Sequence, residues 1–171
     1  MPDRMNRIEE PRGPGAVLPP GLLCAEVVEE SLTALGRWNL GHYIQAGDHV
    51  TRSRFRRLHA AVIESLRARR LDAILTHVDR IAEERFEDSF SLVELQTAFN
   101  VLEEALWRRV LTECDAEEIP DYLGRVSTVL GAGRDRLSRR YVQLIRGNEH
   151  RTPQARALFA GTQGGQEVGH V

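Results

Sequence analysis

Histidines and cysteines are the residues of this 171-residue chain best suited to metal binding or catalysis. They are His42, His49, His59, His77, His150 and His170, with Cys24 and Cys114. No two of them have the spacing HxxxH, HExxH or CxxC, and the chain contains no pair of ExxH motifs, no GxSxG elbow and no P-loop. Such spacings bring metal ligands, or a nucleophile and its base, onto one face. The sequence therefore predicts no metal site, no cofactor and no enzymatic activity.

A second candidate site is a group of aromatic residues that could line a small-ligand pocket. Trp38, His42 and Tyr43 lie close together in the sequence, next to Gly36 and Gly41. The alternative is that these rings pack the end of a helix against the core, a common use of aromatic side chains. We favour this alternative.

A third candidate is a basic patch between residues 52 and 70, where Glu64 is the only acidic residue. The patch consists of Arg52, Arg56, Arg57, Arg67 and Arg70. Clustered arginines can bind the phosphates of nucleic acid or an acidic protein partner. No helix-turn-helix pattern surrounds them, and Phe55 is the only interleaved aromatic residue. We therefore favour a solvated face that pairs with the acidic helix after it.

Composition supports an ordinary globular protein. The formal net charge is −2, and all 23 basic residues are arginine. A near-neutral chain has no overall field that attracts nucleic acid or an anionic membrane. The chain has two distant cysteines and no recognisable signal peptide, which is typical of a protein in a reducing cytoplasm. No apolar run reaches the roughly 20 residues that span a bilayer.

Hydrophobic periodicity predicts an all-α fold of about five helices, either globin-like or an antiparallel helical bundle. The expected helices cover residues 21–45, from 48–53 to 70, 71–86, from 92 to about 114, and 119–147, where Gly147 ends the last one. Five of the seven prolines lie in residues 1–20. We therefore expect a disordered tail at 1–20, one helical domain at 21–147 and a mostly disordered tail at 148–171.

The strongest local signal marks the start of the helix at residue 92. Ser91 and Glu94 form the capping-box pattern, which predicts a helix beginning at Leu92. Its buried stripe is expected to be Leu92, Leu95, Phe99, Leu102, Leu106 and Val110. A second apolar ridge on this helix, together with Val142 of the last one, would suit a dimer interface. That candidate interface consists of Val93, Trp107, Leu111 and Val142.

The run RIAEERFEDSFSLVELQTAFNVLEEALWRRVL resembles the N-terminal sensor domain of RsbR/RsbRD stressosome proteins. The resemblance is carried by Arg85, by Phe90-Ser91-Leu92 and by Glu94-Leu95, and the family's turn glycine is replaced by Ser89. It covers about residues 22–145. Such domains resemble globins without haem, and the position of the globin haem ligand falls at or near Arg85. The resemblance thus implies a pocket filled by side chains.

The resemblance also implies a function. It favours a non-enzymatic bacterial signalling domain, cytoplasmic and homodimeric, that acts through a change in helix packing. The expected partner is a signalling protein of the kinase or anti-anti-sigma type. Two alternatives remain open from the residues: an arginine-rich regulator that binds nucleic acid or an acidic partner, and a small-ligand or cofactor carrier.

Overall fold

The computed structural model describes residues 17–160, and the side chains of residues 17–148. Over that range the chain forms helices and no strand, which confirms the all-α prediction. The helices are α1 (Pro20–Leu23), α2 (Glu26–Gly36), α3 (Gly41–Ala68), α4 (Asp72–Glu87), α5 (Leu92–Glu113) and α6 (Ile119–Ala160). Five were expected, and the sixth arises because the first expected helix is divided.

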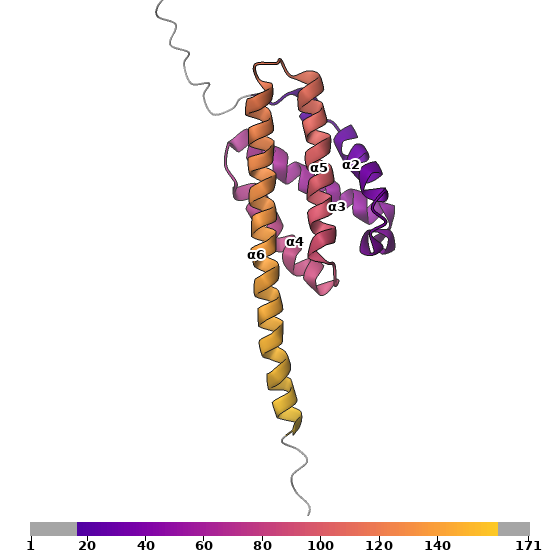
Figure 1. Cartoon of the computed structure of the whole chain (residues 1–171), viewed down its shortest axis with the longest axis vertical. Coiled ribbons are helices and arrows are strands. Elements are labelled where there is room, and N and C mark those ends of the chain that lie inside the picture. Colours follow the sequence, from indigo (N-terminus) through magenta and orange to yellow (C-terminus); the bar gives the residue numbers. More distant parts are fainter. Residues whose placement is uncertain (1–16, 161–171) are drawn as a thin grey trace, which may run out of the picture.

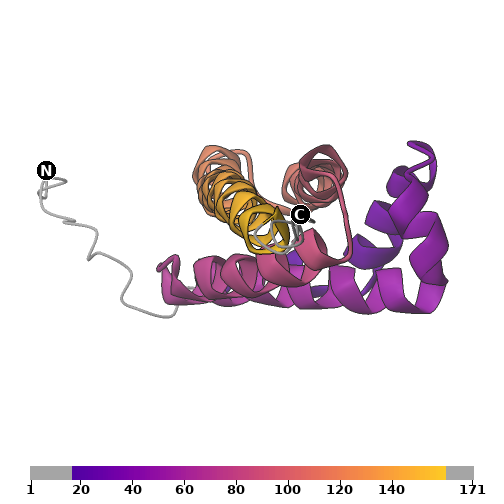
Figure 2. The same cartoon turned by 90° about the horizontal axis from the view of Figure 1, so that it is seen from below.

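The helices pack in two layers. Helices α5 and α6 lie side by side and antiparallel, and α3 runs across them on one side together with α4 (Figures 1 and 2). Helix α2 packs against α5 and α3 at one edge. One continuous core of buried apolar side chains joins all six helices.

The predicted helix at 21–45 is wrong in its boundaries. Its chain is broken after α1 and again after α2, where Asn39 has a positive φ of 49°. Asparagine tolerates this left-handed conformation better than most residues, so it suits the reversal before α3. Gly47, predicted as a break, is a kink inside α3 with a φ of 78° and a ψ of 163°.

Core and helix residues extend into both stretches that were predicted as tails, as far as the structure describes them. Leu18 is buried in the core, so residues 17–20 belong to the folded domain, while residues 1–16 lie outside the described residues. Helix α6 does not end at Gly147 but continues to Ala160. One glycine costs a helix only about 1 kcal/mol relative to alanine, which a long helix tolerates. Residues 161–171 are outside the described range.

The start of α5 is confirmed. The Ser91 hydroxyl accepts a hydrogen bond of 3.2 Å from the Glu94 amide, and the Ser91 amide donates one of 3.1 Å to the Glu94 carboxylate. The predicted stripe faces the core: it is buried from Leu95 to Val110, and Leu92 is half-buried against it. Local chemistry therefore determines where α5 begins, and its apolar periodicity determines which side packs inward.

Candidate functional site

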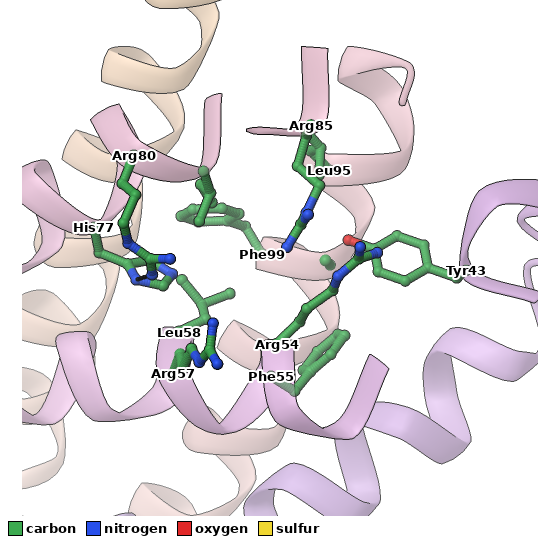
Figure 3. Close-up of a pocket in the computed structure, with 12 residues that line it drawn as sticks. Tyr43, Arg54, Phe55, Arg57, Leu58, His77, Arg80, Arg85, Leu95 and Phe99 are labelled. Atoms are coloured by element: carbon green, nitrogen blue, oxygen red, sulfur yellow. Dashed lines mark hydrogen bonds between the residues drawn. The ribbon is translucent and has the colours of Figure 1, made fainter. Parts of the chain in front are cut away.

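The structure contains a small basic cavity between α3, α4 and α5, which we call the arginine cavity. It is lined by Tyr43, Arg54, Phe55, Arg57, Leu58, His77, Arg80, Ile81, Arg85, Leu95, Ala98 and Phe99 (Figure 3). The free space is about 30 Å³. A single water needs roughly 10–15 Å³ of such space, so the cavity admits only a small group. Four arginines and no carboxylate contribute to the lining.

Helical spacing explains how these residues come together. Arg54 and Arg57 are three residues apart on α3, and His77 and Arg80 are three residues apart on α4, so each pair shares a helix face. Arg85 lies in the last turn of α4 and is buried. Since α3 and α4 pack against each other, their two charged faces meet at the cavity.

Arg54 and Arg85 share their neighbours. Both guanidinium groups lie over the Phe90 ring, at 5.0 Å and 5.6 Å from its centroid. Both also bond the same carboxylate oxygen, Asp88 Oδ2, at 3.5 Å and 3.3 Å. Burial, and then the nearby charge of Arg85, lower the pKa of Arg54 from its usual value. One carboxylate oxygen thus faces two positive charges.

His77 and Tyr43 complete the polar lining. Burial, and then the charge of Arg80, lower the pKa of His77 to about 4, so the ring is neutral near pH 7. Its Nδ1 lies 3.1 Å from Arg80 Nη2 and accepts a hydrogen bond from that group. Burial raises the pKa of the Tyr43 hydroxyl, which therefore stays protonated. Tyr43 also packs edge-on against Phe90, with ring centroids 5.3 Å apart.

The three residues considered for an aromatic ligand pocket do not converge. Trp38 is 63% exposed, whereas Tyr43 is buried in the core. His42 is half-buried, and its Nδ1 lies 2.7 Å from the Glu94 carboxylate. The sequence neighbours separate because residues 37–40 break the chain between α2 and α3. Of the three, Tyr43 alone lines the arginine cavity.

The contact between His42 and Glu94 joins two elements that the sequence analysis treated separately. Glu94 accepts hydrogen bonds from the His42 amide and from the Ser91 amide. Burial opposes ionisation of Glu94, but these hydrogen bonds outweigh it and lower the pKa of the carboxyl group. The charged cap of α5 therefore also holds the start of α3.

The predicted basic patch is divided by ion pairs. Arg52 pairs with Glu29 of α2, and Arg70 pairs with Asp72 at 2.8 Å. The remaining members of the patch are exposed and form no ion pair with a described residue; they are Arg56, Arg57 and Arg67. Binding of nucleic acid or an acidic partner here stays a prediction.

The candidate interface residues on α5 and α6 are exposed. The exposed fractions of Val93 and Leu111 are 68% and 57%, and those of Trp107 and Val142 are 41% and 43%. They form two apolar patches, because Val93 and Val142 lie at one end of the helix pair and the other two lie toward the far end of α5. Between the patches Arg134 of α6 bonds both Asn100 and Glu103 of α5, at 2.6 Å and 2.7 Å.

Sequence reasoning missed the arginine cavity. It considered Arg85 as part of the family resemblance and as the position of an absent haem ligand, and it did not single out Arg54. The spacing of Arg54 could have indicated an inward direction, since the buried Leu58 lies four residues later, on the same face of α3. Pairing with Arg85 depends on the packing of α3 against α4, which the sequence does not show.

Within residues 17–148 no cluster of histidine, cysteine and acidic side chains could hold a metal ion. No helix in the described part of the chain is long and apolar enough to cross a membrane. The fold and the site define an all-α domain with a small basic cavity between α3, α4 and α5 and with exposed apolar residues on α5 and α6.

The chain belongs to the family described as the RsbT co-antagonist protein rsbRD N-terminal domain, whose model matches residues 22–158. The resemblance to stressosome sensor domains is thereby confirmed, and it extends further along α6 than expected. No curated protein and no solved structure matches the chain significantly. The family is a family of stress-signalling domains.

Proposed function

We propose that this chain is a non-enzymatic, cytoplasmic signalling domain of a bacterial stress response and that it acts as a homodimer. The family match over residues 22–158 carries the signalling role. The exposed apolar residues of α5 and α6 support dimerisation, because large apolar side chains grouped on one side of a domain are typical of an interaction surface. A two-fold dimer would bury the same side of both copies.

The proposed mechanism is a shift of α6 against the rest of the domain. The first part of α6 packs against α4 and α5, and its last part extends past the other helices (Figure 1). Arg136 of α6 holds Asp79 of α4 through two hydrogen bonds of 2.7 Å and 2.8 Å. A change in this packing would move the extended end of α6, so the signal would reach a partner without a chemical step.

Light scattering after size exclusion, at micromolar concentration, tests the homodimer. We expect the mass of a dimer for the wild type and of a monomer for Leu111→Glu, since a charge in an apolar interface is poorly solvated. Ile44→Glu is the matched control, because Ile44 is comparably exposed but lies on α3. It should remain dimeric. A monomeric wild type would rule out this part of the proposal.

The partner is expected to be a kinase or an anti-anti-sigma-type protein. Candidates encoded next to this gene can be purified and their binding measured by calorimetry with the full chain. We expect saturable binding to one of them, and weaker binding when the end of α6 is removed after Gly147. If no candidate binds, the proposed signalling partner is wrong.

A further inference from the structure

One buried nitrogen in the arginine cavity has no acceptor. Arg54 Nη1 is inaccessible to solvent and forms no hydrogen bond with any described residue. An unpaired buried donor destabilises the folded state, and more so when it is charged. We propose that the arginine cavity binds a small oxyanion, held by the guanidinium groups of Arg54 and Arg85.

The charge balance around the cavity favours an anion. Its lining includes four arginines and no acidic side chain. The nearest partner, Asp88, is 53% exposed and bonds Arg54 and Arg85 at 3.5 Å and 3.3 Å through a single oxygen. Charged hydrogen bonds of this type are normally about 2.7–2.9 Å long, so both contacts are loose. Glu84 adds a contact of 3.8 Å to Arg85 and pairs with Arg80 at 3.0 Å.

The two guanidinium groups are already positioned. Only 10% of the Arg85 side chain is exposed, and the Phe90 ring lies beneath both groups. Side chains that are ordered before binding lose little conformational entropy when a ligand arrives. The planar fork of a guanidinium matches the oxygens of carboxylates, phosphate and similar anions. The geometry therefore suits an oxyanion.

The size of the cavity and the position of Tyr43 restrict the ligand. Tyr43, Arg54 and Arg85 point toward one another across the cavity (Figure 3). The Tyr43 hydroxyl stays protonated, so it can donate a hydrogen bond to an anion. About 30 Å³ of free space excludes nucleotides and sugar phosphates but admits an anion of a few atoms. Nitrate, formate, sulfate and inorganic phosphate represent this class.

Binding of an anion would connect three helices, since the cavity lies where α3, α4 and α5 meet. The anion is thus a candidate for the signal that the domain senses, and only this sensing role rests on the proposed function. Binding itself is measured on the purified chain without a partner. A failure to bind anions is therefore distinguishable from a failure to dimerise or to bind a partner.

The test titrates sodium nitrate, formate, sulfate and phosphate into the full chain at constant ionic strength, with sodium chloride as the balancing salt. Calorimetry and thermal unfolding report binding. We expect at least one anion to bind saturably and to raise Tm. Arg54→Gln should weaken that binding about 10-fold or more, because it removes a charged hydrogen bond. Arg56→Gln, an exposed neighbour on α3, should bind like the wild type.

Tyr43→Phe keeps the ring against Phe90 and removes only the hydroxyl that donates to the anion. It therefore tests anion binding even if Arg54→Gln does not fold. We expect a weaker affinity with an unchanged helical circular dichroism spectrum. If the wild type binds none of the four anions at millimolar concentration, the proposal is wrong. It is equally wrong if Tyr43→Phe and every folded Arg54 variant bind as tightly as the wild type.

Discussion

Gly133 of α6 lies directly against Phe99 of α5. A Cβ atom added at Gly133 would come 2.8 Å from Phe99 Cε1 and 3.1 Å from Cγ1 of Ile74 in α4. Real Cβ atoms essentially never come within 3.0 Å of another atom, so a side chain at Gly133 would force the buried Phe99 ring to shift. Because α6 packs against both α4 and α5, the contact determines how deeply it lies between them.

Replacing Gly133 with alanine should therefore destabilise the domain. We expect Gly133→Ala to lower the free energy of unfolding by about 1–3 kcal/mol, the usual cost of overpacking a core. Gly131→Ala is the matched control, since a Cβ there meets no atom within 4 Å. It should stabilise α6 by about 0.5–1 kcal/mol through helix propensity. Urea unfolding followed by circular dichroism measures both, and equal effects would contradict the close contact.

The Ser91 cap should contribute to stability through its hydroxyl. Ser91→Ala removes the acceptor for the Glu94 amide, and N-cap substitutions of this type cost about 1 kcal/mol. Thr97→Ala, on the same helix, removes a hydroxyl that bonds only the Val93 carbonyl within α5, and we expect little or no loss. Chemical denaturation compares the two variants. A Ser91→Ala protein as stable as the wild type would show that the hydroxyl adds nothing beyond the bonds that Glu94 accepts from the Ser91 and His42 amides.

Stability should fall in mild acid, partly because of His77. Its folded-state pKa is about 4, below the ordinary value of 6.5. Between these pH values the unfolded chain binds more protons than the folded one, so the free energy of unfolding decreases as the pH falls from 6.5 to 4. His77→Gln should make the free energy of unfolding depend less on pH between 6.5 and 4. Thermal unfolding at a series of pH values measures this dependence. His49→Gln, at an exposed position on α3, is the control and should leave the slope unchanged.

The successes and failures of sequence analysis have separable causes. The start of α5 was predicted to the residue because a capping box is formed by atoms within one turn. The boundaries around Asn39 and Gly147 were missed, since helix breaks depend on how the flanking residues pack. The placement of the aromatic residues was not predictable for the same reason: Trp38 and Tyr43 are close in sequence, but the chain between α2 and α3 directs one outward and the other inward.

By itself, the sequence determined the helical class, the start and inward face of α5, and the family, since each depends on local chemistry or periodicity. Only the tertiary structure brought Arg54 and Arg85 to the Phe90 ring, and only it revealed that Gly133 lies against Phe99. These contacts join residues from different helices. Their geometry depends on packing angles and depths that no single helix encodes.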